Sequence, residues 1–168
     1  MIALRISNNL LEQILHDLRR PHEFAGERVG FIHCRQSALR HGTLLLAHKY
    51  QPIRDDQYIQ DASVGARFDG SCIREGMQTA LTEGTSVFHV HLHDHKGQPR
   101  LSGVDRREMR QMMPCFVNLC PNRLHGALVL SNDSAFATIW GTDLPPEGRT
   151  VDKLSLVGPR TKLWVNHD

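Results

Sequence analysis

Histidines alternate along one short stretch of this chain. His89, His91, His93 and His95 lie within seven residues, out of 11 histidines in the whole sequence. The run SVFHVHLH alternates strictly, which is typical of a β-strand, so we predict a strand over residues 86–93. Because alternate residues of a strand point to the same face, about 6.5–7 Å apart, two of these imidazoles can converge on one metal ion.

A carboxylate follows the histidines at the start of the next predicted element. After the Gly/Pro-containing loop DHKGQPRL, Ser102 is a typical N-cap for a helix, and Asp105 falls on the first turn of that helix. From there the carboxylate can return to His91 and His93 as a third ligand. Two histidines and one carboxylate leave a fourth coordination position open, which is typical of a catalytic rather than a structural zinc site.

With an upstream glutamate, these residues resemble the JAMM (MPN-plus) metallopeptidases. That family combines a glutamate on an early strand, an HxH pair, a short loop and an SxxD sequence that opens a helix. Here Glu27 lies just before the apolar run in GERVGFIHC, residues 91–93 supply HxH, and residues 102–105 supply SxxD. The loop 94–101 is one residue longer than is usual in the family. The resemblance covers roughly residues 1–140.

The resemblance implies a role for each of these side chains. One zinc ion per chain is implied, and its ligands would be His91, His93 and Asp105. The zinc would polarise the scissile carbonyl and lower the pKa of water. Glu27 would take the proton from that water and pass it to the leaving amine, while Ser102 would donate a hydrogen bond to the oxyanion. His89, one step back on the same strand face, either orients a ligand or lines the sheet.

The resemblance also implies a substrate class. The stretch FHVHLHDHKGQPRLSGVD, followed by HGALVLSND, is most similar to bacterial members encoded beside ubiquitin-like conjugation components, including antiphage systems. It implies hydrolysis after the C-terminal glycine of a ubiquitin-like protein, in deconjugation or precursor processing, with E1-like and E2-like proteins as candidate partners. A peptidase acting on a sulfur-carrier protein is the next alternative, and a small-peptide hydrolase the third. The loop-like segments 54–68 and 94–101 are candidates to hold the substrate tail.

Other interpretations of the histidine run stay open. His89, His91 and His93 satisfy most of the HφHφHφφ pattern of histidine-triad nucleotide hydrolases, but Asp94 and His95 stand where that pattern has apolar residues. HLHDH is one residue short of the HxHxDH pattern of metallo-β-lactamases. A non-catalytic MPN scaffold is a further alternative. Metal content separates the enzymes, since triad hydrolases need no metal, lactamase-type folds usually take two ions and JAMM enzymes take one.

The remaining patterns indicate the elements that position these residues. We predict a single α+β domain over residues 1–168, with a mostly antiparallel mixed sheet flanked by about three helices; the resemblance implies the MPN/JAB-like (cytidine-deaminase-like) fold. Predicted strands cover 2–7, 28–34, 43–50, 86–93, 126–132 and 135–141, with shorter ones near 151–157 and 161–165. Predicted helices begin at Ser7, Gly70–Ser71 and Ser102; the first two end near Arg20 and Leu81, and Pro114 ends or kinks the third.

Composition narrows the class of protein. The chain has 40% apolar and 23% charged residues and a formal net charge of +2, so charge gives no indication of nucleic acid or a membrane surface as partner. No apolar run approaches the roughly 18–20 residues of a membrane span, and the N-terminus lacks the features of a signal peptide. We therefore expect a cytoplasmic protein. Its four cysteines, without a CxxC spacing, are expected to be free thiols.

Overall fold

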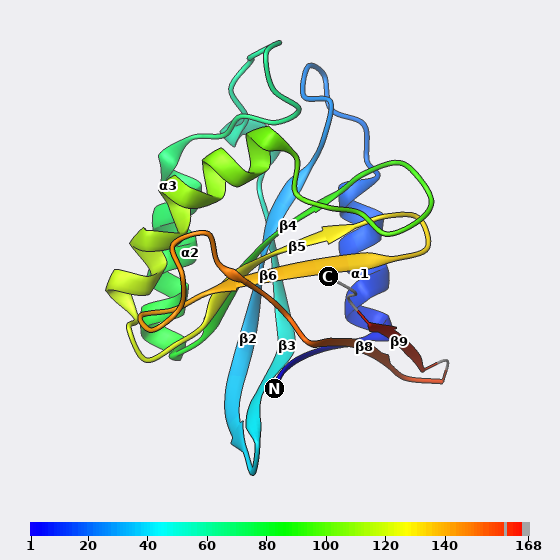
Figure 1. Ribbon diagram of the computed structural model, residues 1–168. Helices are drawn as coiled ribbons and strands as arrows, with labels where there is room; N and C mark the ends of the chain where they lie inside the picture. The colour runs from blue at the N-terminus through cyan, green and yellow to red at the C-terminus, as the bar shows by residue number, and fades with distance from the viewer. Residues whose placement is uncertain (160, 166–168) are drawn as a thin grey trace.

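The computed structural model describes residues 1–159 and 161–165 (Figure 1). A large mixed sheet with helices on both faces confirms the predicted α+β class. The strands are β1 (Ile2–Ser7), β2 (Val29–Leu39), β3 (Gly42–Pro52), β4 (Ser86–Leu92), β5 (His125–Leu130), β6 (Ala135–Trp140), β7 (Arg149–Thr150), β8 (Lys153–Val157) and β9 (Lys162–Val165). The helices are α1 (Asn8–Leu18), α2 (Gly70–Glu83) and α3 (Gly103–Leu119), with the 3₁₀ turn η1 at Asp55–Gln57.

The strands of the described residues form one sheet in the order β7-β6-β5-β4-β2-β3-β1-β8-β9. The pairs β1–β3, β1–β8 and β4–β5 are parallel, and the other neighbours are antiparallel, so the predicted mixed sheet is confirmed. The sheet curls into a half-barrel, with β2 and β3 crossing steeply behind β4–β6 (Figure 1). The histidine-bearing strand β4 is therefore central, paired on one side with β2 and on the other with β5.

The two faces of the sheet bury separate apolar cores. Leu10 and Ile14 of α1 pack into one core with the strands, while Met113 and Phe116 of α3 pack into the other, together with α2. Alternation along β4 assigns its side chains to these faces: Phe88 and Val90 belong to the α1 core, and Val87 belongs to the α2/α3 core. The histidines of β4 therefore point to the side of α2 and α3, as the period-two pattern predicts.

Short local signals set the helix ends. The Ser7 hydroxyl accepts a hydrogen bond from the Leu10 N–H at 3.2 Å, as expected of an N-cap. The second helix has Asp69 as its N-cap and ends at Gly84, whose φ of 62° is the left-handed conformation that favours glycine. These ends lie within two residues of those predicted. In the described part of the chain, no helix is long and apolar enough to cross a membrane.

Of the two effects predicted for Pro114, the end of the third helix does not occur, because α3 continues through this residue to Leu119. A proline inside a helix removes one hydrogen bond and costs about 3 kcal/mol. Met113 and Phe116, on either side of it, are fully buried against the sheet. Burying such side chains contributes about 1.5–3 kcal/mol each, so tertiary packing offsets the local penalty.

Candidate metal centre

Two histidine nitrogens face each other where β4 ends. The Nε2 atoms of His91 and His93 are 3.1 Å apart. His91 is held within the sheet between Val29 of β2 and Val129 of β5. His93 lies just beyond β4, and its N–H donates to the Leu130 carbonyl oxygen at 2.9 Å, so β5 continues to support the chain there. The backbone on which both imidazoles stand is thus fixed by the sheet.

The first turn of α3 brings a carboxylate to the same point. The Asp105 Oδ2 atom lies 3.6 Å from His91 Nε2 and 3.7 Å from His93 Nε2. A tetrahedral zinc with ligands at about 2.0–2.2 Å has its ligand atoms about 3.3–3.6 Å apart. The three observed separations fall within a few tenths of an ångström of that range. The residues that the sequence predicts as ligands therefore fit a zinc ion.

Glu27 lies across from this set, in the loop before β2. Its carboxylate and the Nε2 atoms of His91 and His93 all lie within 4.8 Å of one another, which makes a second possible metal-binding triad. Both donor sets share the two histidines and differ in the carboxylate. The Asp105 separations match those of groups that share a tetrahedral metal ion, and Glu27 lies close to the same two histidines. This arrangement suits a group that contacts a water molecule in the open coordination position.

Ser102 and Asp105 form a capping box at the start of α3. The Ser102 hydroxyl accepts from the Asp105 N–H at 3.1 Å, and the Ser102 N–H donates to Asp105 Oδ2 at 2.7 Å. Ser102 lines the cleft beside Asp105. Burial alone raises the pKa of Asp105, but its interaction with His91 and the hydrogen bonds from Ser102 outweigh burial and hold that pKa below its ordinary value. The carboxylate is therefore charged at neutral pH.

His89 lies deeper, on the floor of the site. Its ring stacks on Phe68 with centroids 6.2 Å apart and meets the edge of Phe31 at 6.1 Å. Burial, followed by the neighbouring His91, lowers the pKa of His89 to about 3, so its imidazole is neutral. Its Nδ1 is buried without a hydrogen-bond partner among the described residues. Burial also lowers the pKa of His93, which favours the neutral imidazole that a metal requires.

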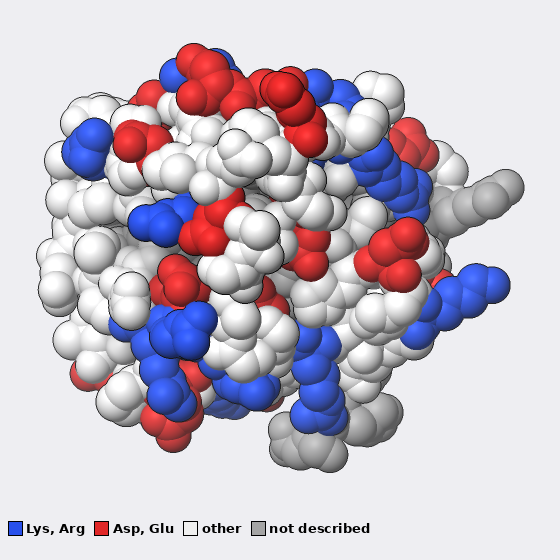
Figure 2. All heavy atoms as spheres, turned by 90° about the horizontal axis from the view of Figure 1, so that it is seen from above, with Lys and Arg blue, Asp and Glu red and all other residues white. Residues whose placement is uncertain are grey.

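All of the predicted site residues line one cleft of about 800 Å³. The loop at residues 61–68 supplies a whole wall of it, together with Ile73 of α2 and side chains of α3. Of the candidate segment 54–68, residues 61–68 therefore lie beside the site. Figure 2 shows acidic and basic side chains interspersed over the described surface seen from above, so neither sign of charge dominates that face.

The other candidate segment, residues 94–101, lies against a different partner. The Gly97 N–H donates to the Asp133 carboxylate at 2.7 Å, and the Ser131 hydroxyl donates to the Gly97 carbonyl oxygen at 2.7 Å. The Asn132 side chain donates to Asp94 at 2.9 Å. These bonds tie the loop to the turn between β5 and β6, and none of the side chains that line the described cleft comes from it.

Sequence reasoning missed one residue of the site, Gly65. Its carbonyl oxygen accepts from the Glu27 N–H at 3.0 Å, and a β-carbon at this position would lie 2.8 Å from the Glu27 carboxylate carbon. Gly65 stands in an irregular segment 38 residues after Glu27, so neither periodicity nor spacing indicates the contact. Comparison with known proteins adds no family assignment: no protein-family model matches the chain, and no curated protein matches it.

Proposed function

We propose that this protein is a zinc-dependent peptidase or isopeptidase with an MPN/JAB-like fold. One observation carries the proposal. Three donor atoms, on His91, His93 and Asp105, lie 3.1–3.7 Å apart in a cleft, and Glu27, which lines the same cleft, offers a ligand atom within 4.8 Å of those of the two histidines. Two imidazoles, one ligating carboxylate and one further carboxylate beside an open position are the groups that metal-assisted hydrolysis needs.

The residues divide the chemistry between them. Zinc, when bound by His91, His93 and Asp105, would act as a Lewis acid toward the scissile carbonyl and the attacking water. Glu27 takes a proton from that water as it attacks, and delivers the proton to the amine that leaves when the C–N bond breaks. Ser102, which lines the same cleft, donates a hydrogen bond from its hydroxyl to the carbonyl oxygen as negative charge develops there.

The proposed substrate is the C-terminal tail of a ubiquitin-like protein. This part of the proposal rests on the resemblance of residues 88–105 and 125–133 to bacterial peptidases of ubiquitin-like conjugation pathways. Such a pathway would place the protein in the cytoplasm beside E1-like and E2-like enzymes, in antiphage defence. A glycine tail has no side chain to anchor, so its register must come from main-chain hydrogen bonds at the cleft wall. The wall at 61–68 is the candidate for these bonds.

A matched pair of fusions tests the proposal. Candidate ubiquitin-like modifiers are joined to a reporter through a Gly-Gly or a Gly-Leu junction and incubated with zinc-loaded protein, and mass spectrometry locates the cleavage point. We expect cleavage after the second glycine and at least tenfold slower cleavage of the Gly-Leu fusion, because a side chain there blocks the close backbone approach. Equal cleavage of both fusions would replace the ubiquitin-like tail with a less selective peptide substrate. Cleavage that survives removal of zinc would exclude the metallopeptidase.

A further inference from the structure

The Glu27 carboxylate packs directly against Gly65 and fills the space that a side chain at position 65 would need. A β-carbon built on Gly65 would lie 2.8 Å from Cδ of Glu27 and 3.1 Å from each carboxylate oxygen. Approaches this short do not occur between real β-carbons and their neighbours, so any side chain at position 65 displaces something. The Glu27 N–H also donates to the Gly65 carbonyl oxygen at 3.0 Å. The glycine therefore meets both the backbone and the carboxylate of Glu27.

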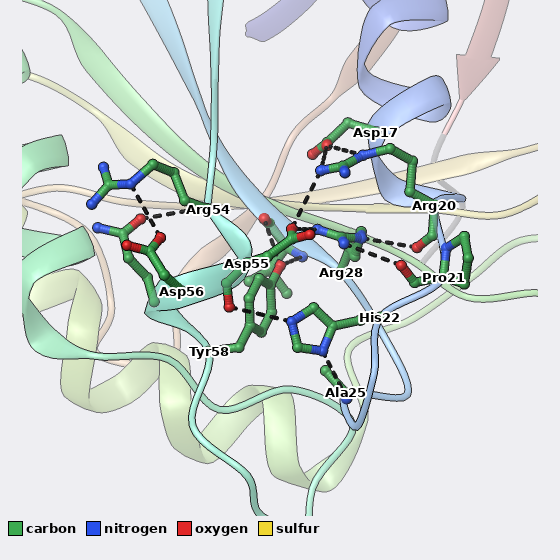
Figure 3. A network of polar contacts seen from close by, with 12 residues as sticks. Asp17, Arg20, Pro21, His22, Ala25, Arg28, Arg54, Asp55, Asp56 and Tyr58 are labelled. Atoms are coloured by element: carbon green, nitrogen blue, oxygen red, sulfur yellow. Dashed lines mark hydrogen bonds and ion pairs between the residues drawn. The ribbon is translucent and has the colours of Figure 1, made fainter.

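The backbone behind Glu27 is held by its neighbour in sequence. The Arg28 side chain is only 2% exposed, and its guanidinium donates to the carbonyl oxygens of Arg20 and Pro21 at 2.8 and 3.1 Å. It also donates to the Asp55 carboxylate at 2.7 Å. Figure 3 shows this guanidinium at the centre of the network, between the loop that precedes β2 and the segment that contains η1. A charged group with so many partners resists movement of the chain beside Glu27.

The loop that carries Gly65 is held as well. Its two ends are joined by the Ile59 N–H, which donates to the Arg67 carbonyl oxygen at 2.8 Å. Inside the loop, the Asp61 carboxylate accepts from the Ser63 N–H and hydroxyl at 3.0 and 2.6 Å, and from the Arg67 guanidinium at 2.9 Å. With both backbones fixed, the group that yields to a new side chain at 65 is the Glu27 carboxylate, the far end of a flexible side chain.

We propose that Gly65 is a positioning residue for the reaction. Because Gly65 has no side chain, the Glu27 carboxylate can occupy the space beside it, close to His91 and His93. The hydrogen bonds of Arg28 hold the backbone next to Glu27 in place. The inference rests on the proposed function, in which Glu27 is the general base. It makes a specific claim about substitution: a methyl group at 65 moves the base out of place and leaves the fold and the metal ligands as they are.

The test compares Gly65→Ala with Gly26→Ala in the full-length zinc-loaded protein. Gly26 is the matched control because it lies in the same pair of loops, and its new β-carbon would meet only the Gly65 carbonyl oxygen, at an ordinary 3.6 Å. We expect Gly65→Ala to lower kcat at least tenfold, with zinc content and Tm equal to those of Gly26→Ala. Combined with Glu27→Gln, Gly65→Ala should lower kcat no further, because residues that act through one group are not additive.

A second measurement needs no substrate. In Co(II)-substituted protein, the absorption spectrum of Gly65→Ala should match that of Glu27→Gln, while Gly26→Ala should keep the wild-type spectrum. A wild-type spectrum for Gly65→Ala, an unfolded Gly65→Ala, or an undiminished effect of this substitution on kcat in the Glu27→Gln background would overturn the proposal. If the wild-type protein cleaves no fusion at all, the proposed function fails, and the cobalt spectra still decide whether Gly65 positions Glu27.

Discussion

Two sets of residues that line the cleft are held in place by different kinds of structure. The metal wall consists of His91, His93 and Asp105, and the base wall consists of Glu27 and Gly65. The metal wall has His91 on the central strand β4, His93 just beyond the end of this strand, and Asp105 on the capped helix α3, and both elements pack on an apolar core. On the other wall Glu27 and Gly65 stand on irregular loops that side-chain hydrogen bonds hold in place. Metal binding therefore depends on regular structure, whereas the orientation of the base depends on a few polar contacts. Substitutions on the two walls should separate metal content from catalytic rate.

The largest effect is expected on the metal wall. His91→Ala, His93→Ala or Asp105→Ala should each reduce zinc from about one ion per chain to a small fraction and abolish cleavage, because three protein ligands leave no redundancy. Metal analysis of the purified protein by mass spectrometry measures this directly. His95→Ala is the control, since this imidazole lies in the exposed loop and bonds to the Lys96 carbonyl oxygen. Loss of zinc in His89→Ala but not in His93→Ala would show that the ligand register is wrong by two residues.

The next largest effect is expected on the base wall, where a substitution of Glu27 should change the catalytic rate and not the metal content. Glu27→Gln should keep its zinc and its fold while kcat falls about 10²–10⁴-fold, the usual contribution of a general base. Zinc content and single-turnover cleavage of the Gly-Gly fusion are measured on the same preparation. Zinc lost together with activity would instead make Glu27 a ligand, in the second donor set with His91 and His93. Activity near that of the wild type would exclude Glu27 as base and direct attention to Glu23.

A smaller effect is expected from the network behind Glu27. Arg28→Met keeps the bulk of a buried side chain but removes its hydrogen bonds, and its partner Asp55 is 60% exposed and can be solvated by water. We expect a loss of about 1–3 kcal/mol in the free energy of unfolding, and a fall in kcat without a fall in zinc content. Urea denaturation measures the first. The control Arg54→Met removes an exposed ion pair with Asp56 and should stay within about 0.5 kcal/mol.

The smallest effect concerns the loop at 61–68 in acid. Hydrogen bonds from Ser63, then the Arg67 guanidinium, lower the pKa of Asp61 to about 2, compared with about 3.9 in an unfolded chain. Because the folded pKa is the lower one, the stabilisation is complete above pH 4 and is lost as the pH falls toward 2. Amide exchange in the loop should therefore increase over this window. Asp61→Asn should show faster exchange already at neutral pH and a weaker dependence on pH; unchanged exchange would contradict the role of this carboxylate.

Local signals in the sequence predict most of the helices and strands, and they predict the metal wall of the site. Period-two alternation placed His91 and His93 on one face of a strand, and the Ser102 cap placed Asp105 on the first turn of a helix. These signals are local: they depend on strand rise and on helix capping, which act over a few residues. The same kind of signal failed at Pro114, where a local rule ended a helix that distant packing continues.

The base wall, by contrast, depends on contacts that form only when distant parts of the chain meet in the folded protein. The partners of Arg28 lie 7, 8 and 27 residues away in sequence, and the glycine that seats Glu27 lies in a segment with no periodic pattern. The parallel pairing of β1 with both β3 and β8, which curls the sheet, likewise joins distant parts of the chain. Such contacts depend on which surfaces meet once the chain is compact. Neither composition nor spacing carries that information, because many different sequences can supply a buried arginine partner or an unobstructed glycine.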